Sequence, residues 1–275
     1  MSFLYTSGVL ANYIKGEIER LWKLSNNEPS QRERGVEDLT VKLIWSGGLD
    51  STILLETVLA LGMRVDIVSA NIINNTEKTE REKKSRETIL GKLVKKYPKK
   101  IRHYYEQDIV MRQQVVGCAL RRTQYPVHLF NSIYYPEDLD VILLGFIQDD
   151  VMHVPDENGN LTSDASLFQK TFNTFKPMLG SENNVSMMFP LINLTKEDIY
   201  KEATVEALTD TTWCEHAVEL YGKLAAGPYG KKMANVCFRC KPCLLMMKTI
   251  AAVEVMDAVF SIKGVEDVKE TVELL

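Results

Sequence analysis

The segment Ser46-Gly-Gly-Leu-Asp-Ser51 has residue types and spacing that indicate chemistry on an anion. An apolar run precedes it at 41–45 and an apolar helical pattern follows at 53–61, so the segment is predicted to form a strand, a tight loop and a helix. Glycines let a backbone approach an anion closely, and the positive end of a helix dipole adds to the loop N–H groups. We therefore predict that this loop holds phosphate.

The pattern resembles the signature of the PP-loop ATP pyrophosphatases, which bind the pyrophosphate of ATP and activate a carboxylate or carbonyl oxygen by adenylation. It is not a Walker loop, because the Gly-Lys-Ser/Thr ending is absent. A bare turn without a ligand is the alternative. The resemblance implies that the ATP-binding residues are Ser46, Gly47, Gly48, Leu49, Asp50 and Ser51.

Four of the 5 cysteines occur near the C-terminal end with a spacing that is typical of metal sites. Four thiolates complete the tetrahedron of a structural Zn²⁺ site, and an iron–sulfur cluster is the competing interpretation. His216 is an alternative fourth ligand, buried free cysteines are the alternative to any metal, and Cys118 is expected in the core. The predicted zinc ligands are Cys214, Cys237, Cys240 and Cys243.

Acidic and basic residues are interspersed along the chain, with a net charge of −4 and a pI near 5.7. This argues against a nucleic-acid-binding protein held by a basic face and favours a small-molecule or protein substrate. The sequence has no apolar stretch of the roughly 20 residues that span a bilayer, and its start lacks a secretory signal pattern. We expect a cytoplasmic protein.

Strand and helix patterns alternate along most of the chain. Strands are expected at 63–69, 101–105 and 140–145, and a capping box at Thr79–Glu82 is predicted to open an exposed helix that reaches about Lys96. A further helix is expected from Val9 to Leu24. This alternation predicts an α/β fold with a parallel sheet and helices on both faces, in which ligands bind beyond the carboxyl ends of the strands.

An acidic segment follows the strand that ends at Gly145, and it contains Asp150, Pro155 and Asp156. Such a loop can present carboxylates to a ligand, and a solvated loop is the alternative. Further on, Thr195 is a predicted N-cap that places Lys196 in the first turn of a helix, where a cation opposes the helix dipole. Lys196 is therefore a candidate for binding an anionic ligand, and a plain surface lysine is the alternative.

Together these motifs resemble the 7-cyano-7-deazaguanine synthase (QueC) family of PP-loop enzymes over most of residues 41 to 250. The spacing of Gly145, Asp150, Pro155 and Asp156 is similar to the family's substrate loop, and Pro190-Leu191 with Lys196 is similar to its P-L-x4-K element. The resemblance implies a five-stranded parallel PP-loop sheet, Rossmann-like, in the adenine nucleotide alpha hydrolase-like class. The expected regions are a helical extension (1–40), an ATP-binding domain (41–200) and a helical zinc-binding region (201–275).

The resemblance also implies an activity. In that family ATP adenylates the carboxylate of 7-carboxy-7-deazaguanine, ammonia attacks to give an amide, and a second activation gives the nitrile. Asp50 would cap the helix or hold Mg²⁺, Lys196 would stabilise the transferring phosphoryl group, and the acidic loop would bind the base. This implies an ATP-dependent C–N ligase with catalytic residues Asp50 and Lys196, expected as a homodimer.

The chain departs from the family pattern near the substrate loop. Val154 replaces the family's tyrosine, and Glu157-Asn158 replaces its Cys-Arg pair. The resemblance therefore implies a divergent member of the family, expected to act in queuosine biosynthesis or in antiviral defence. In the second case the activated deazaguanine would be joined to a protein amine. A tRNA thiolase and a non-catalytic nucleotide-binding partner are further alternatives, and the acidic pI disfavours the thiolase.

Overall fold

A computed structural model describes residues 3–25, 33–72, 76–109, 124–133, 136, 138–155, 158, 160–179 and 185–212. The strands are β1 (Thr40–Ile44), β2 (Arg64–Ile72), β3 (Ile101–Ile109), β4 (Val141–Leu144), β5 (His153–Pro155), β6 (Leu161–Ser163) and β7 (Ser186–Met188). The α-helices are α1 (Gly8–Ser25), α3 (Leu49–Ala60), α4 (Thr76–Lys96), α5 (Gln124–Ile133), α6 (Asp164–Phe175), α7 (Lys196–Glu202) and α8 (Val205–Asp210). Short 3-10 helices are η1 (Val36–Asp38), η3 (Gln148–Asp150) and η4 (Lys176–Leu179).

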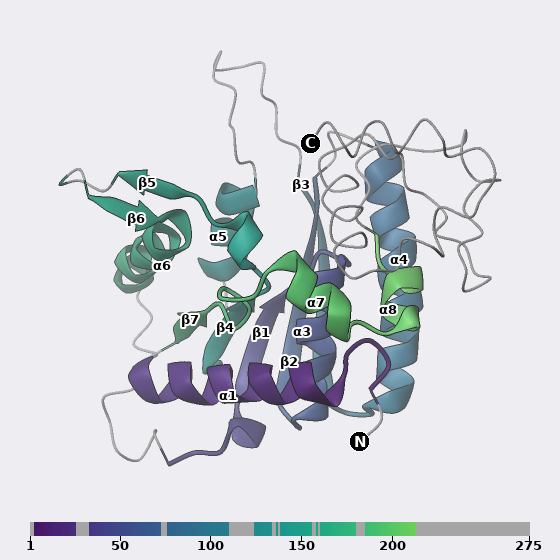
Figure 1. Cartoon of the computed structure of the whole chain (residues 1–275). Helices are drawn as coiled ribbons and strands as arrows, with labels where there is room; N and C mark the ends of the chain where they lie inside the picture. Colours follow the sequence, from purple (N-terminus) through teal and green to yellow (C-terminus); the bar gives the residue numbers. More distant parts are fainter. Residues whose placement is uncertain are drawn as a thin grey trace.

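The main sheet has five parallel strands in the order β3-β2-β1-β4-β7 (Figure 1). The chain moves from β1 outward to β2 and β3, and then returns to the other side of β1 with β4. This reversal makes the carboxyl ends of β1 and β4 a topological switch point, where open α/β sheets bind ligands. The predicted mixed α/β fold with a parallel sheet flanked by helices is confirmed.

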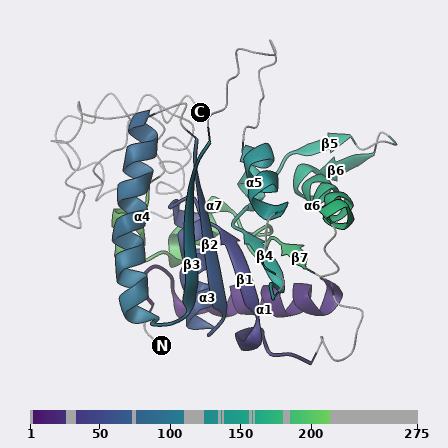
Figure 2. The ribbon, with the colours of Figure 1, turned by 180° about the vertical axis from the view of Figure 1, so that it is seen from behind.

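Both faces of the central strands are buried. β1 and β4 are buried at every residue, and their alternate side chains enter two separate apolar clusters. α1, α3 and α4 contribute to the first cluster, while α5 and α6 lie on the opposite face (Figure 2). The sheet is therefore a layer between helices, as its nearly continuous apolar strands predict.

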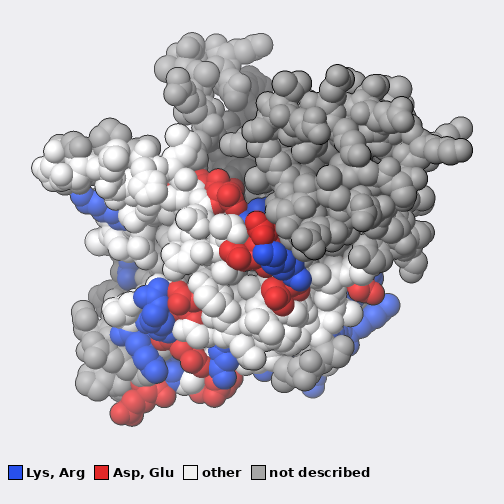
Figure 3. Space-filling model, viewed as in Figure 1, with Lys and Arg blue, Asp and Glu red and all other residues white. Residues whose placement is uncertain are grey.

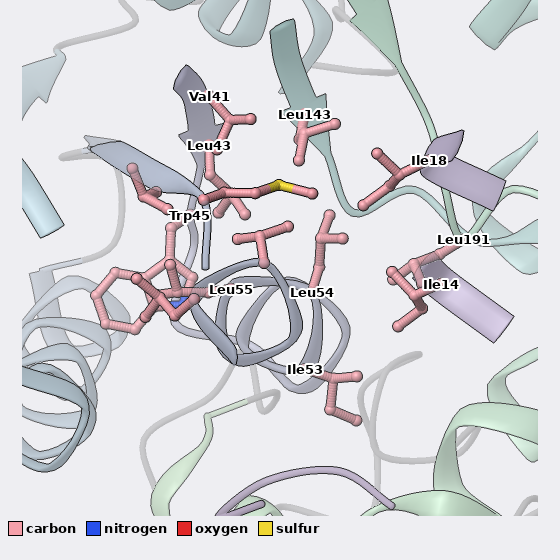
Figure 4. Packing of buried hydrophobic residues seen from close by; sticks show 14 of the residues in the cluster. Ile14, Ile18, Val41, Leu43, Trp45, Ile53, Leu54, Leu55, Leu143 and Leu191 are labelled. Atoms are coloured by element: carbon pink, nitrogen blue, oxygen red, sulfur yellow. The ribbon is translucent and has the colours of Figure 1, made fainter. Parts of the chain in front are cut away.

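The first apolar cluster packs α3 against one face of the sheet. α3 is buried along almost its entire length, so it sits between the sheet and α1. The apolar stripe of α1 recurs every four residues at Leu10, Ile14, Ile18 and Trp22, which turns one face of this helix toward the core. Figure 4 shows Leu54 and Leu55 of α3 near Val41 and Leu43 of β1, Leu143 of β4, and Ile14 and Ile18 of α1.

Three expectations about the elements need correction. α4 begins at Thr76, so Thr79 lies inside the helix and is buried there, and the predicted capping box at Thr79–Glu82 is wrong as a helix start. β3 continues to Ile109, beyond the predicted end at 105, because it pairs with the full length of β2. The segment after Asp150, expected as a loop, contains the antiparallel pair β5 and β6.

None of the described helices is long and apolar enough to cross a membrane.

A fully buried carboxylate fixes the N-terminal segment to α3. Both oxygens of Glu56 accept hydrogen bonds from the backbone, from Leu4 N and Tyr5 N, each at 2.6 Å. The ammonium of Lys96 and the hydroxyl of Tyr97 also donate hydrogen bonds to Glu56 Oε1, each at 3.0 Å. Because a buried charge is costly unless it is paired and hydrogen-bonded, these contacts are what allow Glu56 to lie in the core.

A buried lysine gives the fold a pH dependence that can be measured. Lys42 lies in β1 beside Asp66 of β2, and burial lowers the pKa of Lys42 from 10.5 to about 8. Between pH 8 and pH 10.5 Lys42 is therefore mostly protonated in the unfolded chain and mostly neutral in the folded one, so folding releases a proton. The free energy of unfolding consequently rises with pH in that interval. From pH 8 to pH 10 we expect the parent to gain about 2 kcal/mol relative to Lys42→Met in urea unfolding. Lys84→Met, at an exposed site, should show no such change, and a flat difference for Lys42→Met would contradict the prediction.

Candidate functional site

The loop between β1 and α3 is closed by short internal hydrogen bonds. The hydroxyls of Ser46 and Ser51 lie 3.0 Å apart, and Gly48 N donates to Ser46 Oγ at 3.2 Å. Trp45, just before the loop, is fixed through its own backbone, because its N–H donates to Val68 O at 2.8 Å and its carbonyl accepts from Ser69 Oγ at 2.7 Å. The first and last residues of the predicted ATP-binding loop are thus in contact, at the N-terminus of α3.

The glycines of the loop have different structural roles. Gly47 has a φ of +83°, a left-handed conformation that side chains disfavour, and a Cβ there would lie 2.8 Å from Arg86 Cγ. Gly48 has an ordinary extended conformation and occupies the N-cap of α3. Asp50 lies in the first turn of α3, so the expectation that Asp50 caps the helix is wrong.

Gly145 allows close packing between the end of β4 and the start of α3. A Cβ at Gly145 would lie 3.0 Å from Ser51 Cα and 3.2 Å from Ser51 N. This contact brings the loop after β4 beside the Ser46–Ser51 loop, as the sheet topology predicts. Close packing against Ser51 therefore explains why position 145 is a glycine, which the sequence pattern alone did not reveal.

Lys196 and Asp50 form an ion pair although they are 146 residues apart in the sequence. Lys196 Nζ lies 2.8 Å from Asp50 Oδ1 and 2.7 Å from Asp50 Oδ2, and both side chains are largely shielded from solvent, with exposed fractions of 12% and 19%. An acidic group in the first turn suits the helix dipole but repels an incoming anion. The ammonium of Lys196 offsets that repulsion and places a cation at the loop.

The loop after β4 brings two more carboxylates to this ion pair. Asp149 Oδ2 accepts a hydrogen bond from Lys196 N at 2.5 Å, which fixes the start of α7 against η3. Asp150 is exposed as a residue, but partial burial of its carboxyl group and the nearby charge of Asp50 raise its pKa. Figure 3 shows acidic and basic side chains gathered in a patch near the middle of this face.

Thr195 is the N-cap of α7, as predicted. Its hydroxyl accepts a hydrogen bond from Asp198 N at 3.2 Å, and Asp198 Oδ2 accepts one from Thr195 N at 2.9 Å. This capping box sets the direction in which α7 begins. It therefore determines where Lys196, the first residue of the helix, projects its side chain toward Asp50.

The remaining predicted site residues fall in two groups. Pro155 lies in β5, where its register partner is Leu161 of β6. Asp156, Cys118 and His216 lie outside the described residues, as do the predicted zinc ligands Cys214, Cys237, Cys240 and Cys243. Substrate binding and zinc binding by these residues stay predictions.

The sequence did not single out Arg86, which contacts the loop, or Asn71 and Glu106, which bind Arg86. Arg86 Nη1 donates to Ser46 O at 3.1 Å, and its Nη2 reaches Asn71 Oδ1 at 2.5 Å. Arg86 belongs to a helix rich in charged residues, so nothing in its type separates it from solvated neighbours. A usable signal was its spacing of three and seven residues from the apolar Ile89 and Leu93, which places it on the inward side of α4.

Comparison with known proteins gives no family assignment. No protein-family model matches the sequence, and no curated protein matches it. A similarity in structure is found with FMN adenylyltransferase from Candida glabrata, solved with FMN and the ATP analogue AMPCPP. The two chains share 10% identity with a TM-score of 0.31, over 70% of this chain and 56% of the other. The match spans little more than half of that enzyme.

Proposed function

We propose that the chain is an ATP-dependent enzyme that adenylates a carboxylate and releases pyrophosphate. The observation that carries this proposal is the Lys196 to Asp50 ion pair, with both Nζ to Oδ distances under 3 Å, at the N-terminus of α3 beside the Ser46–Ser51 loop. The loop and the helix dipole suit an anion, and Lys196 supplies the cation that pairs with negative charge during transfer.

The chemistry follows from these positions. The substrate carboxylate attacks the α-phosphorus of ATP, the bond to the pyrophosphate oxygen breaks, and the leaving pyrophosphate takes the electron pair. Lys196, released from Asp50, would pair with the phosphate charge that develops, and the loop N–H groups would hold the leaving group. Carboxylate oxygens are the ligands that Mg²⁺ prefers, so Asp50 would hold Mg²⁺, which neutralises polyphosphate charge.

We further propose 7-carboxy-7-deazaguanine as the acid and a nitrogen nucleophile as the acceptor. The support is the sequence resemblance to 7-cyano-7-deazaguanine synthases together with the carboxylates of the β4 loop. The nucleophile attacks the acyl adenylate, AMP leaves, and an amide results; a second activation of the amide would give the nitrile. A structural zinc ion held by Cys214, Cys237, Cys240 and Cys243 belongs to the same proposal.

Mass spectrometry of the products tests the assignment. The chain is incubated with ATP, Mg²⁺, 7-carboxy-7-deazaguanine and ammonium, and in parallel with candidate protein partners in place of ammonium. We expect AMP and pyrophosphate in equal amounts with a deazaguanine amide, and no AMP with 7-deazaguanine, which lacks the carboxylate. A deazaguanine adduct on a protein amine would identify the conjugating activity. AMP release that requires tRNA instead, or no AMP under any condition, would reject the substrate assignment.

A further inference from the structure

Arg86 of α4 connects the carboxyl ends of three neighbouring strands. Its Nη1 donates to the carbonyl of Ser46, just beyond β1, at 3.1 Å. Its Nη2 donates to Asn71 Oδ1 in β2 at 2.5 Å and to Glu106 Oε1 in β3 at 3.1 Å. Asn71 also donates to Glu106 Oε1 at 2.7 Å. One guanidinium therefore links the loop to both adjacent strands.

A contribution to folding stability does not by itself explain why this guanidinium is buried. The Arg86 side chain is only 1% exposed, and its Nε is a buried atom for which the described residues provide no hydrogen-bond partner. Burial alone would raise the pKa of Glu106, but hydrogen bonds from Asn71, Tyr104 and Arg86 hold it below its usual range. Arg86 is thus a charge withdrawn from water, whereas the Glu106 side chain is 29% exposed. Because burying a charge costs free energy that its partner must offset, such an arginine is often no more stabilising than a well-packed apolar side chain.

The contact with Ser46 fixes the orientation of one peptide group in the loop. The described peptide bonds are all trans, so the N–H of Gly47 points opposite to the Ser46 carbonyl, away from Arg86. The side chain also restricts the position of this peptide, because Arg86 Cγ lies only 2.8 Å from the place that a Cβ of residue 47 would take. If the Ser46 carbonyl turned outward, a negative dipole would face the bound anion instead of a donor.

We propose that Arg86 is a positioning residue for the phosphate loop: it holds the Ser46–Gly47 peptide so that the Gly47 N–H is available to the pyrophosphate of ATP. The inference rests on the proposed ATP-dependent function and assigns a role to a residue outside the loop motif. Loss of Arg86 should therefore weaken binding of the β- and γ-phosphates and leave binding of the adenosine and α-phosphate unchanged.

Calorimetric titration of the intact chain with Mg·ATP and, separately, with AMP tests this role. For Arg86→Met, which keeps an unbranched stem without the charge, we expect the Kd for ATP to rise about 10- to 100-fold, the loss typical of a charged hydrogen bond. The Kd for AMP should stay within about threefold. A purely structural role would weaken both nucleotides in parallel, and that result would overturn the proposal.

Two further variants make the test decisive. Lys84→Met removes a positive charge from an exposed site of the same helix and should bind ATP and AMP like the parent. Arg86→Lys keeps the charge but loses the planar fork that reaches Ser46 and Asn71 together, so we expect an intermediate loss for ATP alone. If Arg86→Met does not fold and Arg86→Lys binds ATP like the parent, the proposal is wrong. A parent that binds no ATP would instead reject the proposed function itself.

Discussion

Replacing Lys196 with Met should lower the rate of ATP-dependent AMP release about 100- to 1000-fold, the cost typical of removing one group that stabilises transition-state charge. Lys196 Nζ lies within 2.8 Å of both Asp50 oxygens and is only 12% exposed, so its charge acts where water screens it weakly. The substitution also leaves Asp50 without this partner, which adds repulsion against a bound phosphate. Single-turnover measurement of AMP with saturating ATP reports the effect.

Lys201→Met is the matched control for Lys196→Met. Lys201 lies on the same helix and pairs with Glu197 at 2.6 Å, but both side chains are well exposed, so its loss should change AMP release less than about twofold. The backbone hydrogen bond from Lys196 N to Asp149 is kept in both variants, so the start of α7 should be unchanged. A Lys196→Met variant that folds and turns over within threefold of the parent would remove Lys196 from the reaction centre.

The sequence predicted the centre of the fold well because periodicity and burial agree there. β1 and β4 are buried on both faces, so β4 is an unbroken apolar run and Lys42 is the one charged residue in β1. α3 follows directly after the loop, where Gly47 has a left-handed conformation. The prediction also placed Lys196 at the start of its helix from the Thr195 cap. What it did not predict is the direct pairing of Lys196 with Asp50, because side-chain contacts between distant segments depend on how α7 packs.

Local signals failed where tertiary contacts overrode them. Thr79 and Glu82 have capping-box spacing, but the same spacing fits one turn inside a helix, and the burial of Thr79 holds it against the body of the protein. The antiparallel pair of β5 and β6 was not predicted: Pro155 disfavours a strand, although Asn158-Gly159 is a hairpin signal in the sequence. Arg86 was missed because its residue type does not distinguish it from its exposed charged neighbours, and its spacing to the apolar Ile89 and Leu93 is a weak signal in so charged a helix.

Gly47→Val should reduce ATP-dependent pyrophosphate release at least about 100-fold, because a displacement of about 1 Å in a positioned group costs that much. A β-branched residue resists the φ of +83° at position 47, and its Cβ would meet Arg86 Cγ at 2.8 Å. The loop and the Arg86 side chain cannot both keep their places. We expect a loss of about 1–3 kcal/mol in the free energy of unfolding, so the folded fraction must be measured alongside activity.

Gly91→Val separates this effect from the general consequence of adding a side chain. Gly91 is a helical residue of α4 with nothing within 4 Å of the position of a Cβ, so Val there should leave pyrophosphate release unchanged and stability nearly so. The same substitution is made at both sites, but of the two only Gly47 has a left-handed backbone beside a buried guanidinium. If folded Gly47→Val released pyrophosphate like the parent, the anion would not be held by the Gly47 backbone, and the phosphate site would have to lie elsewhere on the chain.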